Sequence, residues 1–562
     1  MNVSPRLVGT VAVALSLSAL CGLAFAAETA PAASGRPNED EMFGGSAAAS
    51  ASSPSDAGVV AAPSAADAST VVGPVVPAGE PSRSAESTAP PSASPSTRDD
   101  SILGDPNGGP KLSQDAAPDD PLRIGGQLYL RALARGAQGQ NVKNVPFSAP
   151  SLVDGYFDAR PNDRVRGFVL ARLSFDSTLP SQSSTSTSTN LSANSLAVPL
   201  LSGQTQTRGP SAALDQLWLR FDIARTVFVT VGRQHVKWGT ARFWSPTDFL
   251  HPQARNPLAA FDARTGFTML KLHLPIESRA WNFYAFGLFE GATQLDATGR
   301  PIAGSDTAGT IRQLGGAARA EILLGPVEFG LDTVLYAGKR PKAGADVSFG
   351  IWDLDLYIDA GFRAGSEVAR RSYNPDDITF NTDPSLEFDA RLADWVDRKY
   401  PVKLQSGIKP QVTVGGTYSL KYNDNDVFTM TGEYFYNTLG YDDPHLYPGL
   451  FLSNSFQYFY TGRHYASLSF VAAAPYSWNY TTFTLTTLGN LSDQSFITRF
   501  DYSLVLLTHL RFEAFGAVNY GHEAGEFRLG VSGFSVPTSM GSREVSQAAQ
   551  SYSLGLGLRV SL

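Results

Sequence analysis

Residues 551–562 at the end of the chain, SYSLGLGLRVSL, decide the fold. Large apolar residues occupy every second position, and small or polar residues lie between them. One face holds Tyr552, Leu554, Leu556, Leu558, Val560 and Leu562. The other holds Ser553, Gly555, Gly557, Arg559 and Ser561. Successive side chains of a strand point to opposite faces, so this pattern predicts a strand with lipid on one side and a polar lumen on the other, as in a transmembrane β-barrel.

The same alternation recurs from about residue 121 to the end, for example in 164–176, 214–223 and 352–363. It predicts an all-β domain, 121–562, folded as an antiparallel up-and-down barrel of about 18 strands, with 16 as the lower alternative. The expected strands lie near 122–135, 151–159, 164–178, 212–223, 227–238, 264–275, 280–290, 312–323, 326–338, 343–350, 352–363, 409–422, 426–438, 463–473, 479–489, 496–507, 510–520 and 551–562.

The connections between these strands alternate in length. Those after even-numbered strands are short, such as Arg225-Thr226, Gly325-Pro326 and Thr508-His509. Those after odd-numbered strands are mostly long: 179–211, 239–263, 291–311, 364–408, 439–462 and 521–550. Outer-membrane barrels have short turns on the periplasmic rim and long loops outside. A soluble all-β domain has no reason to sort its loops in this way, so both ends of the barrel domain are predicted to face the periplasm.

Composition excludes several other classes of protein. Charged residues make up 17% of the 562 residues and the mean hydropathy is −0.11, which is too polar for a helical membrane protein. The formal charge of −8 gives no basic surface for nucleic acid. After residue 26 no stretch reaches the ~18 apolar residues that a transmembrane helix needs. Any membrane span must therefore be a strand of a closed barrel.

The first 26 residues are predicted to be a secretory signal peptide. Arg6 supplies the positive charge, Leu7 to Phe25 the apolar stretch, and Ala24-Phe25-Ala26 the small-residue cleavage site, so the expected cut follows Ala26. A lipoprotein signal is the alternative, because the one cysteine, Cys21, lies here. Leu20 precedes it, where lipid attachment favours a small residue. Cleavage leaves a mature chain without cysteine.

Residues 27–120 are rich in Ala, Ser, Pro, Gly and Asp and show neither helical nor strand periodicity. Such a segment cannot bury enough apolar surface to offset chain entropy. It is predicted to be a disordered periplasmic tether, and a role in reaching cell-wall or periplasmic partners remains open. It cannot form the folded plug of a TonB-dependent transporter, and about 440 residues are too few for the 22 strands of that class. Because 16 to 18 strands enclose an aqueous lumen, the preferred function is a pore for small polar solutes.

Charged residues on the predicted inner faces form two blocks. Arginines cluster on the third and fourth strands, and aspartates cluster on the eleventh, nearly opposite. The candidates for the pore wall are Arg164, Arg166, Arg172, Arg220, Asp353, Asp355 and Asp359. This arrangement suggests a transverse electric field across the bore. The alternative is a solvated or mutually ion-paired wall without selectivity.

The most distinctive stretch runs through 232-GRQHVKWG-239, 243-FWSPTD-248 and Asn256-Pro257. It resembles the GRQ…WG…NP-D segment of a loosely defined set of Gram-negative porin-like outer-membrane barrels, with Ser245-Pro246 in place of the usual Asn-Pro. The topology also resembles that of general porins, whose third loop folds inward and sets the narrowest point. That resemblance implies that this segment, the third long loop, constricts the pore.

The constriction would be lined by four side chains: Lys237, Arg242, Asp248 and Arg255. The alternative is an external loop packed by Trp238 and Trp244. These two tryptophans could also stack on sugar rings.

The loop 364–408 is acidic, and its residues Leu392, Trp395, Val396 and Tyr400 could form one face of a short helix. A solvated surface loop is expected, and a site for calcium or for cations that bridge lipopolysaccharide remains open.

No enzyme motif emerges from the sequence. The seven histidines are not spaced as metal ligands, and no nucleophile elbow, HExxH pair or phosphate-binding loop is present. No cofactor or metal is therefore expected, although barrel hydrolases can build their sites across strands. The second functional class is a closed barrel for surface assembly, adhesion or glycan binding. The last strand resembles the C-terminal signal for the barrel-assembly machinery, although it ends in Leu562 where Phe is usual, and a homo-oligomer remains open.

Overall fold

The computed structural model describes residues 121–178, 210–251, 254–259, 264–290, 314–337, 339–365, 369–379, 381, 383, 388–422, 427–453, 455–476, 478, 480–538 and 541–562. The predicted signal peptide and tether lie outside these residues.

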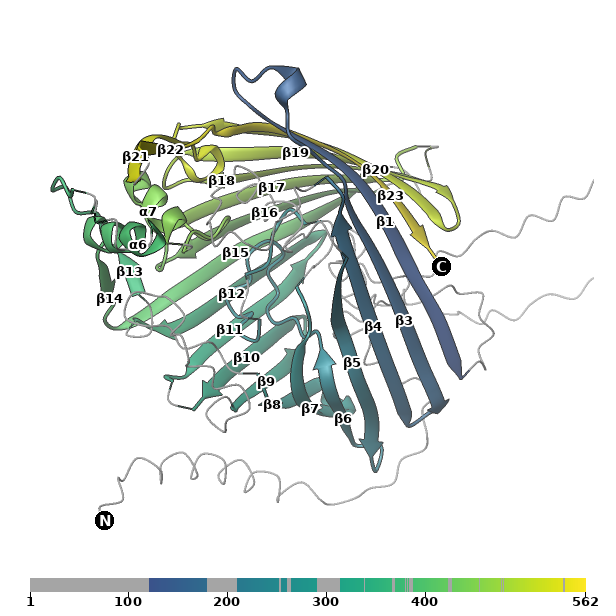
Figure 1. Cartoon of the computed structure of the whole chain (residues 1–562). Coiled ribbons are helices and arrows are strands. Elements are labelled where there is room, and N and C mark those ends of the chain that lie inside the picture. Colours follow the sequence, from purple (N-terminus) through teal and green to yellow (C-terminus); the bar gives the residue numbers. More distant parts are fainter. Residues whose placement is uncertain are drawn as a thin grey trace, which may run out of the picture. The chain divides into compact units, whose positions relative to one another are not determined.

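Eighteen antiparallel strands form one closed ring (Figure 1). Each strand pairs with its neighbour along the chain, and β1 closes the ring by pairing with both β3 and β23. Their bounds are β1 Leu122–Ala137, β3 Pro150–Asn162, β4 Val165–Asp176, β5 Ser211–Ile223, β6 Val227–Gln234, β7 Phe267–Ile276, β8 Trp281–Leu288, β9 Gly315–Leu324, β10 Val327–Tyr336, β11 Lys342–Ile351, β12 Leu354–Ala364, β15 Ile408–Lys421, β16 Val427–Asn437, β17 His464–Ala473, β18 Thr481–Asn490, β19 Ser495–Leu507, β20 Leu510–Gly521 and β23 Gln550–Ser561. The prediction of 18 strands is confirmed. The largest difference from the expected boundaries is at β6, which ends at Gln234 and not near 238.

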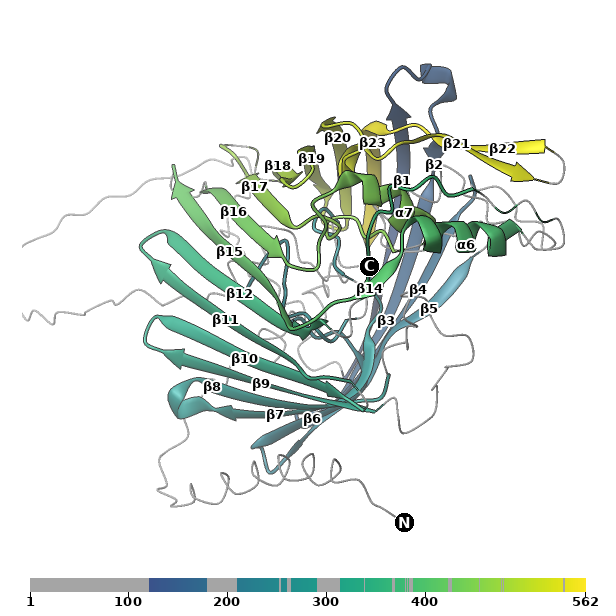
Figure 2. The same ribbon diagram turned by 90° about the vertical axis from the view of Figure 1, so that its left-hand side faces the viewer.

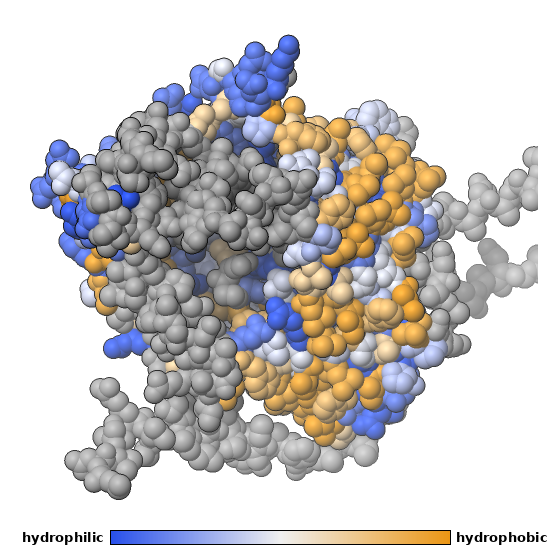
Figure 3. All heavy atoms as spheres, viewed as in Figure 1, coloured by the Kyte–Doolittle hydropathy of each residue, from blue (hydrophilic) through white to orange (hydrophobic). Residues whose placement is uncertain are grey.

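The two faces of the barrel differ as the alternation predicts. On β23, Leu554 and Leu556 are each 55% exposed on the outer face, whereas Ser553 is 2% exposed on the inner face. Figure 3 shows apolar side chains covering the outer face over β1, β3 and β4. Many large apolar residues of the other strands are exposed in the same way, for example Leu217, Leu331 and Phe500. An apolar belt of this kind suits lipid and not water.

The turns on one rim are short and need unusual backbone angles. Ala224 and Arg225 both have positive φ in the three-residue turn 224–226 between β5 and β6. Gly325 supplies a positive φ between β9 and β10, and Trp352 does so between β11 and β12. The same rim holds the end of the chain, where the Leu562 N–H donates to the Gly126 carbonyl at 2.8 Å. The predicted short-turn rim is thus confirmed.

The opposite rim carries the long loops and several short elements. The short elements on this rim are β2 (Phe147–Ser148), β13 (Ala369–Arg371), α6 (Phe388–Lys399), β14 (Val402–Leu404), α7 (Tyr447–Leu452), η7 (Glu526–Arg528), β21 (Val531–Thr538) and β22 (Gly541–Gln547). Shorter 3-10 turns are η2 (Val142–Asn144), η3 (Glu277–Arg279) on the short-turn rim, and η6 (Pro444–Leu446). Among the described residues, no helix has the length and apolarity needed to cross a membrane.

Loop 364–408, expected to be a solvated surface loop whose residues could form one short helix, contains that helix as α6. Leu392 and Val396 of α6, and Tyr400 directly after it, pack against Leu446, with Trp395 at the edge. The β21–β22 hairpin in the last loop was not predicted.

Candidate functional site

The third long loop joins β6 to β7, and its described residues, 235–251, 254–259 and 264–266, lie inside the ring of strands (Figures 1 and 2). Its contacts are with the inner faces of distant strands. The Ser245 hydroxyl donates to Asp359 of β12 at 2.8 Å. Arg499 of β19 donates to the Leu258 carbonyl at 2.8 Å. In the ring order, β12 and β19 flank the strands that lie across the barrel from β6 and β7, so the loop extends across the lumen. The inward path expected for this loop is what the structure has.

Glu433 of β16 holds the middle of the loop. Its carboxylate accepts the backbone N–H groups of Arg242, Phe243 and Trp244, the last at 3.2 Å. It also accepts the hydroxyl of Tyr357 at 2.8 Å. Glu433 is 4% exposed, so this buried charge is satisfied by three loop amides and one hydroxyl. A long loop therefore takes one defined path across the lumen.

The two tryptophans of the motif pack the loop against the wall, and both are fully buried. Trp238 makes an edge contact with Phe286, with ring centroids 5.5 Å apart. Trp244 stacks on Phe435 at 5.8 Å and donates its indole N–H to the Phe459 carbonyl. Buried rings cannot stack on a solute, so the sugar-stacking alternative for these two residues is wrong.

Gly239 lets the chain leave the strand direction beside Trp238. Its φ is +87°, and a Cβ there would lie 2.1 Å from both the Asp359 carboxylate and the Ser245 hydroxyl. The loop and the wall can approach this closely because the residue has no side chain.

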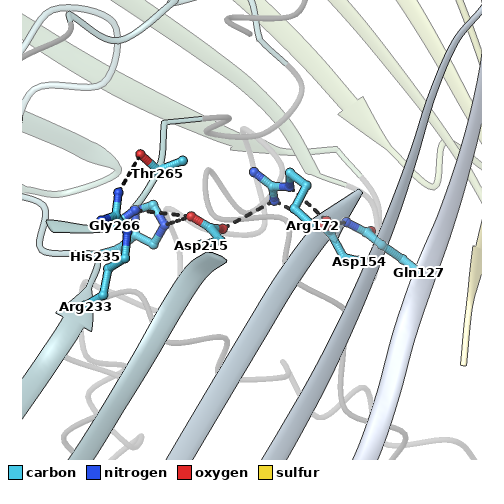
Figure 4. A network of polar contacts seen from close by, with 8 residues as sticks. All are labelled: Gln127, Asp154, Arg172, Asp215, Arg233, His235, Thr265 and Gly266. Atoms are coloured by element: carbon cyan, nitrogen blue, oxygen red, sulfur yellow. Dashed lines mark hydrogen bonds and ion pairs between the residues drawn. The ribbon is translucent and has the colours of Figure 1, made fainter. Parts of the chain in front are cut away.

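Asp215 of β5 ties together the two ends of the loop (Figure 4). It lies at an irregularity in the pairing of β4 and β5. His235 Nε2 lies 2.9 Å from Asp215 Oδ1, and the backbone N–H of Gly266 donates to the same oxygen at 3.2 Å. Asp215 is also 3.5 Å from Arg172 Nη2.

The chain of polar contacts continues along the wall from Arg172. Arg172 makes a two-bond pair with Asp154, at 2.8 and 3.0 Å, and Gln127 donates to Asp154 at 2.8 Å. The base of the loop is therefore fixed to four neighbouring strands, β5, β4, β3 and β1.

A cavity of about 310 Å³ lies between the inward loop and the outer loop 438–463. All four residues predicted to line a constriction, Lys237, Arg242, Asp248 and Arg255, line this cavity. They are joined there by Arg264, Arg363, Gln411, Asn437, Tyr460 and others. The sequence pattern thus located the loop residues, whereas the contributions of β12, β15 and β16 depend on how the barrel closes.

The predicted arginine block is divided by local pairing. Arg164 lies at the short-turn rim, exposed, and binds Asp222 at 3.0 Å. Arg166 pairs with Asp158 at 2.8 Å, and Arg172 pairs with Asp154 as described. Arg220 lies with its guanidinium 5.3 Å from the Trp218 ring centre. The ion pairs of Arg166 and Arg172 correspond to the alternative of an ion-paired wall for this part of the barrel.

The predicted aspartate block is also spread out. Asp353 lies exposed in the turn between β11 and β12 and not on the wall. Asp355 faces inward opposite Gly350. Asp359 is fully buried beneath the loop, where it accepts the Ser245 hydroxyl. The structure thus brings Asp359, and not the other two, to the loop.

Pairing at the point of ring closure brings together a basic sector that the sequence did not reveal. Arg511 lies directly opposite Arg559, and Arg131 of β1 lies opposite Gly557, so their side chains share the inner face. Residues of the same face on β19, β20, β23 and β1 include Arg123, Arg131, Arg135, Arg499, Arg511 and Arg559, with Asp501 and Glu513 as carboxylates. Because β1 and β23 are far apart in sequence, only the assumption of closure could have placed these arginines together.

An acidic sector lies on the inner faces of β9, β10, β11 and β12. It holds Glu321, Glu328, Asp332, Asp346, Asp355 and Asp359, and Arg319 is clamped between Asp332 and Asp346 at 3.3 and 2.8 Å. Strands β15–β18 separate the two sectors on one side and β3–β8 on the other. The barrel wall therefore has charge of opposite sign on opposite sides, with the basic side at different strands from those predicted.

The outer loops are fixed by a second buried acid, Glu526 of η7. Its carboxylate accepts the Tyr465 hydroxyl at 2.5 Å, the Asn490 amide at 2.8 Å and the backbone N–H of Phe459. Burial, with the nearby Asp493 carboxylate as a second cause, raises the pKa of Glu526 to about 8.

Within the described part of the chain, no group of three histidine, cysteine, aspartate or glutamate residues is placed to hold a metal ion. The calcium site considered for loop 364–408 gains no support there.

Comparison with known proteins gives structural neighbours and no family. No family model and no curated protein matches the chain. OccAB1 of Acinetobacter baumannii is 11% identical, with a TM-score of 0.44 over 81% of this chain and 99% of that one. OprB of Pseudomonas putida is 10% identical, with a TM-score of 0.39 over 79% and 94%. A Rhodopseudomonas blastica porin triple mutant is 10% identical, with a TM-score of 0.34 over 78% and 100%. At these values the likeness adds nothing to what the strand pairing shows.

Proposed function

We propose that this chain forms a pore in the outer membrane through which small polar solutes diffuse. The observation that carries this proposal is the loop 235–266, fixed across a polar lumen by Glu433 and Asp215. The outer face is an apolar belt and the inner face carries the charged sectors. A barrel of this strand number encloses a water-filled space. A loop docked across that space narrows it.

The two charged sectors would give the lumen a transverse field. A polar solute can orient its dipole in such a field, whereas an apolar solute would have to displace water from charged side chains and gains nothing in return. Passage by diffusion needs no catalytic group, so no enzymatic activity is part of the proposal. The resemblance of the loop motif to porin-like outer-membrane barrels agrees with it.

The route to the membrane is part of the proposal. Residues 1–26 would direct export and be removed after Ala26, and residues 27–120 would form a tether in the periplasm. The C-terminal strand would be recognised by the barrel-assembly machinery, and the outer rim would face lipopolysaccharide. A homo-oligomer is compatible with the barrel, and the solute remains to be identified by experiment.

The second candidate function is a closed barrel for surface binding or adhesion. The observation in its favour is that outer-loop aromatics are packed and buried, including Tyr447, Phe459 and Phe527. Loops that fill the outer mouth completely would stop diffusion. Conductance separates the two functions directly.

The test is single-channel recording of the mature full-length protein in a planar bilayer. Because that chain is predicted to lack cysteine, single thiols can be placed at will. We expect discrete conductance steps, and a bulky thiol reagent should lower them in the Ala254→Cys variant, since Ala254 lines the cavity. Thr226→Cys, in an exposed turn between β5 and β6, is the control and should be unaffected. A folded barrel that gives no steps would overturn the pore and favour the closed barrel.

A further inference from the structure

We propose that the cavity outside the inward loop is a binding site for a small, multiply charged oxyanion, that is, a phosphate-bearing or polycarboxylate solute. The proposal deepens the pore function by naming the class of solute, and it rests on that function for the solute's onward passage. Binding itself can be measured independently of passage.

The charge of the lining residues is the first argument. Five cationic side chains line the cavity, namely Lys237, Arg242, Arg255, Arg264 and Arg363. Among the described lining residues Asp248 is the one carboxylate, and Arg264 binds it at 2.7 Å. A confined site with this lining has a positive potential that attracts anions.

The hydrogen-bonding capacity of two guanidinium groups at the cavity wall is the second argument. Arg363, at the outer end of β12, lies with its guanidinium 5.3 Å from the Phe249 ring centre, which holds the side chain at the cavity wall. Its Nε is buried without a hydrogen-bond acceptor. Arg255 donates one N–H at 3.1 Å to the Arg242 carbonyl. A guanidinium has five N–H donors in a planar fork that matches carboxylate and phosphate oxygens, so both residues can donate to an anion.

The size and the neutral lining make the third argument. A volume of about 310 Å³ is at the lower end of small-molecule sites and leaves no room for a polymer or a protein segment. Amide and hydroxyl groups, those of Gln411, Asn437 and Gln457 among them, complete the lining and can bind the polar remainder of a solute.

Several cations around one small space favour a ligand with more than one negative charge. A single carboxylate can be held by one guanidinium, whereas Arg255 of the loop and Arg363 of β12 together offer donors for more than one anionic group. A phosphate group, or two or three carboxylates on one small molecule, can contact arginines of the loop and of β12 together. The shared chemistry is therefore a compact multiply charged oxyanion. The choice of probe in the experiment distinguishes a phosphate from a polycarboxylate.

The experiment is calorimetric titration of the detergent-solubilised full-length protein with four probes: inorganic phosphate, citrate, glucose 6-phosphate and glucose. We expect the anions to bind with affinity that falls steeply with added salt, and glucose not to bind. Tightest binding by citrate would assign the polycarboxylate class, and tightest binding by either phosphate probe the phosphate class. Absence of saturable binding by all three anions would overturn the proposal.

Two variants locate the site. Arg363→Gln loses no hydrogen bond of the folded protein that involves its Nε, and should weaken anion binding about tenfold or more, as the loss of one charge-assisted contact implies. Arg279→Gln removes the same charge from the turn between β7 and β8 and is the matched control. Equal affinity in wild type and Arg363→Gln, with both proteins folded, would place the binding elsewhere and reject this site. Saturable binding without conductance would refute the pore and leave the oxyanion site standing, whereas conductance without binding would do the reverse.

Discussion

Replacement of Glu433 by glutamine should release the inward loop while leaving the barrel intact. Glu433 lies on β16, far along the chain from the loop, and its carboxylate is the acceptor for the backbone N–H groups of Arg242, Phe243 and Trp244. Glutamine has nearly the same shape, so the wall keeps its packing. One of its two terminal atoms is an NH2 group, however, which cannot accept an N–H and instead faces the donors of the loop.

The expected magnitude follows from the bonds that are lost. A hydrogen bond to a charged group contributes about 1.5–3 kcal/mol. At least one of the two carboxylate oxygens stops accepting, and the desolvation cost of the buried charge is relieved in part, so docking should weaken by about 2–4 kcal/mol. Each 1.4 kcal/mol is tenfold in an equilibrium, so the ratio of undocked to docked loop should rise roughly 30- to 700-fold.

Two assays report the position of the loop. In single-channel recordings the variant should show frequent transitions to a state of higher conductance, because the bore widens when the loop leaves it. The loop should also be cut faster by a protease added to intact barrels in detergent. Glu513→Gln is the matched control, since Glu513 is an inward glutamate of β20 whose partners, Tyr129 and Arg559, lie on the wall. Unchanged current noise together with unchanged cleavage in the Glu433 variant would refute the role assigned to the carboxylate.

Four other predictions concern the base of the loop, the charged sectors of the wall and the outer loops. Asp215→Ala should lower the melting temperature of the barrel, since both ends of the loop lose their shared acceptor, and a heat-dependent shift in gel mobility measures this. The double change Arg511→Gln and Arg559→Gln should move the reversal potential in a salt gradient toward cation preference, and an unmoved potential would exclude the basic sector from the conducting path. Asp353→Asn should leave that potential unaltered, because Asp353 lies in an exposed turn. Burial raises the pKa of the Glu526 carboxyl to about 8, so its contribution to anchoring the outer loops is full at acidic pH and is lost as pH rises through about 8. Protease cleavage of those loops should increase over that range in the wild type, and much less in Glu526→Gln.

The strands could be predicted from sequence because their determinants are local. Alternation along 551–562 or 214–223 reports directly which face meets lipid, since each outward residue loses contact with water regardless of its neighbours. The alternation of short and long connections then fixed the direction of each strand. The end of β6 was predicted too far along, because Val236 and Trp238 continue the apolar alternation while packing inside the barrel. A buried loop and an outward strand face can show the same pattern.

Only the part of the site that lies on one segment of the chain could be predicted from the sequence. Lys237, Arg242, Asp248 and Arg255 belong to the loop itself, and its motif identified them. Arg363 could not be assigned to the same cavity, because that requires knowing how far the loop reaches across the ring.

Ring closure also explains why the charge pattern was placed on the wrong strands. The electric potential that a charge on the wall produces depends on the charges next to it. The charge of Arg172 is largely neutralised by Asp154 on the neighbouring strand. Arg511 and Arg559 face each other directly, and their carboxylate neighbour Glu513 pairs with only one of them. Two adjacent guanidinium groups repel one another, which costs folding energy. In the open lumen proposed for this barrel, water would screen part of that repulsion while the potential still acted on a passing anion. By the same reasoning, a dry, closed lumen would leave the repulsion within this sector unscreened, which is unfavourable. Conductance, and not stability, is therefore the decisive measurement for this protein.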